Sequence, residues 1–496
     1  MCERTSIEWM FTISCILFLG LINVFNFITF IEESVFIWII PMIFIIAGLY
    51  FLVRYIKIRP AYFALIILFM SFFLKAVIAI VYNAPQKSDF LNIYNAALKA
   101  ARGDFSFSAN GYFSLWAYQT GIVAFYSFVV KVFGGCMLVP KIINCMFMAG
   151  SNTILYLLSK RLVSDSYARL IALVYLIYPA PYFLASVLTN QHISNFLFLL
   201  GVFIYTSEHK SIVLRIVMSA VAIAVGNALR PQGIVVVFAV VGTLLLEVMY
   251  NLKNRTIAAK SIVSAVSFLI IYILLMQGLS FGVKATNLNK SGLANNFPLY
   301  KFVVGLNYKT NGSYSQDDVN AYVSIRDHKL RDEKAAIAIR DRLSDPGHLS
   351  GLLINKQKAM WASLDDSIDW GFDYLRAPGI NILGRNVTYP FFRLNMQKLE
   401  KIFYTFIILL ATLGLLLKNG NVKGNRVSLI MLFVIFTNFF AYTLVEIQSR
   451  YRDFQLIFLF LAAAVGSEAV GKLFLSQIRN RNRNRQKKVK ISIRQF

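Results

Sequence analysis

The sequence predicts an all-α polytopic membrane protein, and three observations support that prediction. Only 15% of the 496 residues are charged, against about 25% in an average soluble protein. The apolar residues, 57% of the chain, occur in runs of about 17 to 23, the length that crosses about 30 Å of hydrocarbon. Basic residues flank alternate runs, as they do where charge orients membrane helices. A water-soluble globule is therefore excluded, and the formal net charge of +26 is mostly a topology signal.

Twelve apolar runs qualify as membrane-spanning helices, and both chain ends then lie on the same side. We expect them at about residues 9–30, 35–53, 61–82, 138–158, 167–186, 193–206, 212–229, 233–250, 261–283, 401–417, 427–445 and 454–474.

The first three runs bring a long polar stretch to the outer face. The turn with Glu32 and Glu33 is acidic and is expected outside, whereas the loop 54–59 is basic and is expected inside. The third helix then leads to residues 83–110 on the outer side, which follows from the alternation.

Residues 112–134 are apolar but do not form another span in this interpretation. Gln119 and Lys131 interrupt them, and no charged loop follows. We expect interfacial helices here, within the first large outer loop.

The next six runs alternate in the same way. Basic residues mark inner loops at 160–161, 208–210 and 253–260, and the uncharged residues 189–192 mark an outer loop. At 230–233 a Pro and a Gly break the apolar run, so two helices meet there on the outer side.

Residues 284–400 are the one large polar segment, with 16 Lys/Arg and 12 Asp/Glu. They are too many for a passive connector, and the apolar spacing at 335–343 and 352–361 predicts helices. We expect a folded segment of mixed structure on the outer surface; a purely structural cap is the alternative.

The last helix leads to a basic tail, residues 475–496, with eight Lys/Arg and no acid. We expect this tail to contact anionic membrane lipids of the inner leaflet. Nucleic-acid binding is not expected, because no folded nucleic-acid module accompanies the basic run.

The predicted organisation places a multi-pass protein in the cell membrane, with both termini cytoplasmic. An N-terminal transmembrane module covers residues 1–283 and includes the outer loop 83–134. An extracytoplasmic segment (284–400), the C-terminal helices (401–474) and the cytoplasmic tail (475–496) follow.

Asp89 is a functional candidate, because ionisable groups near the hydrocarbon are costly. It follows the third helix closely, where a carboxylate could accept a proton from an attacking hydroxyl. An ordinary solvated acid, or the N-cap of a helix at 92–101, is the alternative. Asp104 fits a turn residue better.

Three arginines on the outer side are the other candidates. Arg230 ends an apolar helix, where its planar donors suit phosphate oxygens; a snorkelling arginine is the alternative. Arg450 and Arg452 lie outside against the positive-inside trend and need a partner. That partner is an anionic lipid phosphate or, alternatively, Glu446 or Asp453.

Several motifs occur in a characteristic order, at residues 87–90, 112–121, 131–134, 159–162, 229–233 and 448–452. Together they resemble the GT-C superfamily of integral-membrane glycosyltransferases, which includes protein O-mannosyltransferases and lipid A aminoarabinose transferases. The first three are similar to that family's first outer loop, and the others to its "RRL" helix end, its "RPxG" break and its "RY" loop.

The resemblance implies a GT-C-type bundle of about 12 helices with a catalytic face that is extracytoplasmic. It implies inverting transfer from a polyprenyl-phosphate sugar donor to a glycan or polymer acceptor. Asp89 would be the general base, and Arg230, Arg450 and Arg452 would bind the donor phosphate. The remaining candidates would line the substrate cleft: Tyr451, Gln119, Gln191, His192 and Asp104. No cofactor is expected, and a divalent metal requirement is left open.

An envelope polysaccharide or teichoic acid is favoured over protein as the acceptor. One alternative is a transporter or flippase of polyprenyl-linked saccharides, and another is a polymerase or ligase of them. Transporters commonly contain repeated halves, and the sequence shows no internal repeat. The outer location of the polar candidates also favours chemistry at that face.

Overall fold

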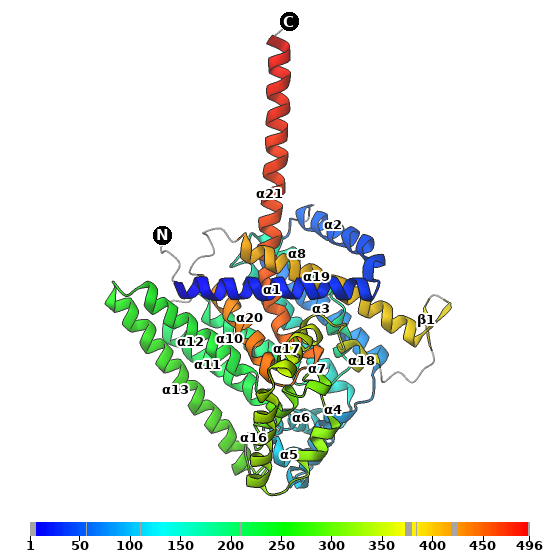
Figure 1. Cartoon of the computed structure of the whole chain (residues 1–496), viewed down its shortest axis with the longest axis vertical. Helices are drawn as coiled ribbons and strands as arrows, with labels where there is room; N and C mark the ends of the chain where they lie inside the picture. The colour runs from blue at the N-terminus through cyan, green and yellow to red at the C-terminus, as the bar shows by residue number, and fades with distance from the viewer. Residues whose placement is uncertain are drawn as a thin grey trace.

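The computed structural model describes residues 6–55, 57–109, 111–208, 211–372, 379–382, 384–417 and 425–494 (Figure 1). Within them, ten helices are long and apolar enough to cross a membrane, as a multi-pass helical membrane protein requires. They are α1 (Ser6–Glu32), α2 (Ile39–Tyr55, preceded by the 3₁₀ turn Val35–Trp38), α3 (Pro60–Tyr82), α7 (Leu138–Ser159), α11 (Ile212–Leu229), α12 (Gly233–Tyr250), α13 (Arg255–Ala285), α19 (Tyr389–Leu416), α20 (Arg426–Leu444) and α21 (Arg452–Arg494).

Two of the twelve predicted spans are shorter than expected. The run at 167–186 divides into α8 (Asp165–Ile177) and α9 (Ala180–Leu184). Tyr178 is extended there, as the residue before a proline usually is, and so the helix ends. The run at 193–206 forms α10 (Gln191–Tyr205), which has 15 residues. A count of twelve spans therefore stays a prediction.

Helices α13, α19 and α21 extend beyond the apolar runs that predicted them. Helix α19 begins at Tyr389 instead of 401, because a proline in its first turn is compatible with a helix and the mixed apolar and polar residues 391–400 continue it. Helix α21 continues to Arg494 and projects from the molecule at the top of Figure 1. The predicted lipid contacts of the tail concern side chains beyond residue 477, outside the part that the structure describes.

The remaining elements are short and belong to the two segments predicted outside. The first segment contains α4 (Ser88–Ala101), α5 (Gly111–Leu115) and α6 (Thr120–Phe133). The second contains α14 (Tyr300–Gly305), α15 (Gln316–Asp318), α16 (His328–Ser344), α17 (Pro346–Trp361), α18 (Ser367–Phe372) and the antiparallel strands β1 (Gly379–Ile382) and β2 (Arg385–Thr388), in which Gly379 faces Thr388. The predicted mixed structure and the two predicted helices are thus confirmed.

Helix α6 has 14 residues, too few to cross the hydrocarbon alone. It packs mainly against α4 and makes fewer contacts with the long helices α7 and α11. The expectation that residues 112–134 are not a full span therefore fits the structure, and their location in the interface stays a prediction.

Described residues from the segments that the sequence places on the outer side contact one another. We call them the loop-rich end: residues 83–109, 111–134, 185–191, 230–232, 286–372, 379–382, 384–388 and 445–452. The Tyr118 backbone N–H donates to the Ala294 carbonyl (3.0 Å), and the Glu446 N–H donates to the Lys301 carbonyl (2.9 Å). Figure 1 shows α4, α5, α6 and α16 together at the bottom of the molecule.

Segments predicted inside also contact one another. The Asn425 amide donates to the Arg161 carbonyl (3.0 Å), and the Arg426 guanidinium pairs with Glu247. Polar loops thus collect into the two groups that alternating spans require. The positive-inside rule assigns the second group to the cytoplasm, and that assignment stays a prediction.

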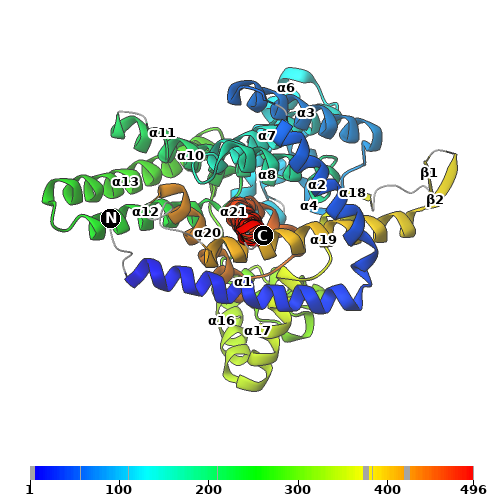
Figure 2. The same cartoon turned by 90° about the horizontal axis from the view of Figure 1, so that it is seen from above.

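Helix α21 forms the centre of the bundle, with α19 packed along it (Figure 2). A Cβ atom at Gly466 of α21 would lie 1.9 Å from the Leu410 carbonyl oxygen of α19. Glycine is required there because the two backbones touch, as small residues allow between membrane helices. Arg452 begins α21, and Arg450 lies in the 3₁₀ turn Ser449–Tyr451 immediately before it.

Candidate functional site

Asp89 lies in the first turn of α4, at the loop-rich end. The helix begins at Ser88 instead of 92, so Asp89 is inside it and is not its N-cap. Ser88 has a φ of 49°, a left-handed conformation that is uncommon outside glycine and often found near functional sites.

The Asp89 carboxylate is available for chemistry. It makes no hydrogen bond or ion pair with any residue that the structure describes, and its side chain is exposed. Nevertheless the surrounding protein desolvates the carboxylate and raises its pKa; Arg450 and Lys301 oppose this rise, and Glu446 adds to it. The side chain is thus exposed while neighbouring protein atoms reduce its solvation, and a raised pKa suits a general base.

Arg450 is held from several sides and keeps one donor unused. Its Nε donates to the Gln448 side chain (2.6 Å), and its guanidinium lies 4.0 Å from the centre of the Trp370 ring. Its Nη1 is buried and has no hydrogen-bond partner among the described residues. A buried guanidinium nitrogen without an acceptor is costly, so an incoming anion would be stabilised there.

Arg230 lies in the same region. Its Nε donates to the Gln232 side chain (2.7 Å), and its Nη1 donates to the Asn190 side chain (2.8 Å). Its Nη2 makes no hydrogen bond to any residue that the structure describes. Desolvation lowers the pKa of Arg230, and Arg450 contributes to that shift by like-charge repulsion. Two arginines close enough to repel each other favour a shared anion.

Tyrosines and glutamine connect these charges. Tyr112 lies close enough to Asp89 for their charges to interact, and its hydroxyl is hydrogen-bonded to Gln119. The Asn190 amide, which binds Arg230, also reaches the Gln119 side chain (3.4 Å). Tyr451 lies below the Arg230 guanidinium, 5.5 Å from ring centre to charge. Gln119 and Tyr451 thus lie beside these charges, and their part in a substrate cleft stays a prediction.

Lys301 and Glu446 complete the cluster and were missed as site residues. They form an ion pair between α14 and the loop before α21. The Lys301 side chain remains 38% exposed, whereas the Glu446 side chain is 5% exposed. No local sequence signal marks Lys301, because its partner is far along the chain. We call Asp89, Arg230, Lys301, Glu446 and Arg450 the charged cluster.

Arg452 lies apart from the charged cluster. It is buried, and its guanidinium pairs with Asp365 (3.0 Å) instead of the Glu446 or Asp453 suggested by the sequence. It also donates to the backbone carbonyls of Ser449 (3.0 Å) and Ser363 (3.3 Å). With its donors occupied by protein oxygens, this arginine resembles a structural ion pair more than an anion site.

The other predicted cleft residues have varied positions. Asp104 is exposed and accepts a hydrogen bond from the Ser106 backbone N–H (2.9 Å), which fits the turn role that the sequence favoured for it. Gln191 is buried and donates to the Arg450 carbonyl (3.1 Å). His192 is buried and bonds the Leu184 carbonyl (3.0 Å).

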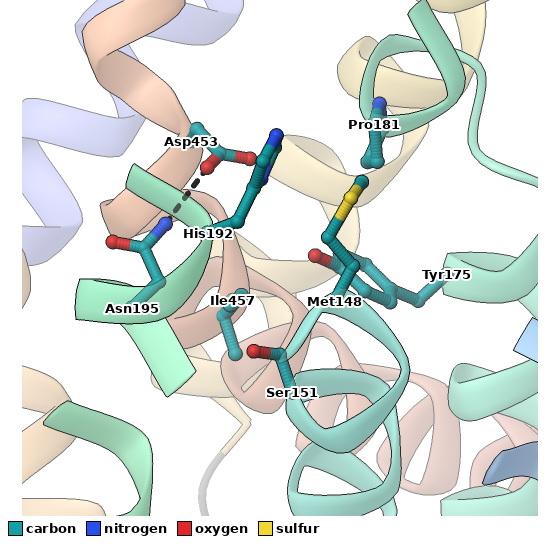
Figure 3. Close-up of a pocket in the computed structure, with 8 residues that line it drawn as sticks. All are labelled: Met148, Ser151, Tyr175, Pro181, His192, Asn195, Asp453 and Ile457. Carbon is teal, nitrogen blue, oxygen red and sulfur yellow. Dashed lines mark hydrogen bonds between the residues drawn. The ribbon is translucent and has the colours of Figure 1, made fainter. Parts of the chain in front are cut away.

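His192 lines a small cavity together with Asn195 and Asp453, about large enough for one water molecule (Figure 3). In it, the Asn195 amide donates to the Asp453 carboxylate (2.7 Å). The cavity is too small for a sugar and does not reach the charged cluster's exposed acid. Elsewhere, no three His, Cys, Asp or Glu side chains of the described residues come together as metal ligands.

No protein-family model, no curated protein and no solved structure matches the chain. A function has to be inferred from the charged cluster and the chemistry that it allows.

Proposed function

We propose that the protein is a membrane glycosyltransferase of the GT-C type. It transfers a sugar from a polyprenyl-phosphate-linked monosaccharide to an acceptor hydroxyl outside the cell. One observation carries the proposal: Asp89 is an exposed carboxylate with no hydrogen bond or ion pair among the described residues, and it lies near the Arg450 charge. Arg450 and Arg230 each keep a guanidinium nitrogen that has no acceptor in that part of the chain.

The proposed reaction is a single displacement. Asp89 removes the proton from the acceptor hydroxyl while its oxygen forms a bond to the anomeric carbon of the sugar. The bond from that carbon to the phosphate oxygen breaks, and the phosphate leaves with the electron pair. Because attack and departure occur on opposite faces, the configuration is inverted, and no second carboxylate nucleophile is needed.

Arg230 and Arg450 would stabilise the charge that develops on the departing phosphate. Their free nitrogens provide fixed donors, so little reorganisation is needed during the reaction. Lys301 is paired with Glu446, but its side chain is partly exposed, and its charge adds to the positive potential near Asp89. Arg452 is assigned to the structure and not to the donor, because its donors bind protein oxygens.

The acceptor that we favour is an envelope polysaccharide or teichoic acid. The protein would lie in the cell membrane with its termini in the cytoplasm and the loop-rich end outside. No nucleotide sugar is available on that side, which is consistent with a lipid-linked donor.

The test is release of polyprenyl phosphate by the purified protein from polyprenyl-phosphate monosaccharides, with a panel of glycan and polymer acceptors. Release that depends on an acceptor supports the proposal. Absence of release with every donor and acceptor would instead favour a transporter or a polymerase.

Asp89→Asn should lose transfer by at least about 10²-fold, as expected for loss of a general base. Asp104→Asn is the matched control, since Asp104 is also an exposed aspartate of the first outer loop but lies in a turn. Full activity of Asp89→Asn would remove the general-base assignment.

A further inference from the structure

Residues 363–370 of the large outer segment hold the turn that carries Arg450 and Arg452. The Arg450 backbone N–H donates to the Asp366 carboxylate (2.7 Å), and the Asp366 N–H donates to the Ser449 hydroxyl (2.8 Å). Asp365 pairs with Arg452 in the same turn (3.0 Å). Two adjacent aspartates of the outer segment thus bind Arg450 and Arg452, which lie over 80 residues further along the chain.

Arg450 is fixed at both its backbone and its side chain. Asp366 binds its N–H, and Gln191 binds its carbonyl. The guanidinium stacks on Trp370, and Phe90, the neighbour of Asp89, lies 5.2 Å away on another side. Trp370 and Phe90 also contact each other, with ring centres 5.3 Å apart. Phe90, next to the proposed base, and Trp370 of the outer segment therefore both contact the Arg450 guanidinium.

This arrangement leaves Nη1 of Arg450 without a hydrogen-bond partner among the residues that the structure describes. Its Nε, its backbone N–H and its carbonyl all bind the protein. A free Arg side chain loses conformational entropy when it binds an anion, and one that is already held loses less. The contacts thus hold the Arg450 guanidinium in one orientation before an anion binds, which is what a preorganised anion site requires.

We infer that Asp366 and Trp370 are positioning residues, which hold Arg450 in the orientation needed to bind the phosphate of an anionic polyprenyl lipid. The inference rests on the proposed function. It assigns the outer segment a part in the site, in place of the purely structural cap that the sequence left as an alternative.

The chemistry of each contact indicates which substitution should keep the positioning effect and which should remove it. Asp366 acts as an acceptor for a backbone N–H, so Asn can replace it but Ala cannot. Trp370 acts through an aromatic face, so Phe should retain part of the effect whereas Leu should not.

The test measures binding of polyprenyl phosphate to the full-length protein in detergent, with the uncharged polyprenol as the matched lipid. Asp366→Ala and Trp370→Leu should each weaken phosphate binding about tenfold, since small displacements of a positioned charge have large effects. Polyprenol binding should not change. Asp366→Asn and Trp370→Phe should remain within about threefold of the wild type. Unchanged polyprenol binding by Asp366→Ala and Trp370→Leu excludes loss of folding as the cause of their weaker phosphate binding. Asp341→Asn, an exposed change on α16, is the control.

Each outcome supports or overturns a defined claim. If the wild type prefers polyprenyl phosphate and Asp366→Ala binds it equally well, the positioning inference is wrong and the proposed function is unaffected. If Asp366→Ala loses the preference but no donor is ever turned over, the inference stands and the transferase proposal fails. If the wild type does not prefer the phosphate, both are overturned.

Discussion

Replacing Arg452 by leucine should destabilise the protein strongly, although the sequence alone suggested that this arginine binds substrate. The Arg452 side chain is 2% exposed, and that of its partner Asp365 is 7% exposed. Arg452→Leu leaves the Asp365 carboxylate buried without its counter-charge, which costs about 3–5 kcal/mol for such pairs. For a chain of this length that corresponds to a fall in Tm of about 5 °C.

The assay is thermal unfolding of the detergent-purified protein, followed by tryptophan fluorescence. Trp361, which is fully buried, reports on the region. The double variant Arg452→Leu with Asp365→Asn removes both charges and keeps an acceptor for the Ser367 N–H that Asp365 binds (2.7 Å). It should therefore be more stable than Arg452→Leu alone.

A different result would refute this reasoning. If Arg452→Leu kept the wild-type Tm and lost only the binding of polyprenyl phosphate, Arg452 would be a donor ligand, as the sequence resemblance implied. The ion pair with Asp365 would then contribute little to stability.

Further predictions concern the pH profile and the packing of the helices. Because desolvation raises the pKa of Asp89, kcat/KM for transfer should begin to fall at a higher pH than it would with an ordinary aspartate as the base. Arg450→Gln should move this acidic fall to higher pH, and Glu446→Gln should move it to lower pH. If neither variant moves the pH profile, Asp89 is not the base. Gly466→Ala should lower the free energy of unfolding by about 1–3 kcal/mol or prevent assembly, which Tm and purification yield would measure. Gly351→Ala is the control and should be neutral, because a Cβ atom there meets open space. Equal effects of the two substitutions would disprove the close contact at Gly466.

Most of the fold could be predicted because the membrane imposes a length and a charge rule on each helix. Ten of the predicted runs coincide with long apolar helices, and the loops predicted on each side contact one another. The break at Tyr178 was missed because it lies within an apolar run, where only the following proline signalled it. The early start of α19 was missed because charged and polar side chains between residues 393 and 400 interrupt the apolar pattern from which the spans were predicted.

The site could be predicted only where a residue violated a local rule. Asp89, Arg230 and Arg450 were found because charges near the hydrocarbon, or arginines on the outer side, require a reason. Lys301 and Asp366 follow no such rule, because their significance comes from partners over 80 residues away. Arg452 likewise has a distant partner, Asp365, which the sequence did not indicate.

The central claim is that Asp89 and the arginines of the charged cluster form one site for a polyprenyl-phosphate sugar. The most direct measurement is an electron cryo-microscopy structure with a donor analogue whose sugar–phosphate bond cannot break. We expect its phosphate at hydrogen-bond distance, about 3 Å, from Nη1 of Arg450 and Nη2 of Arg230, with the anomeric carbon facing Asp89. A phosphate bound away from both arginines, or at the opposite end of the bundle, would contradict the account.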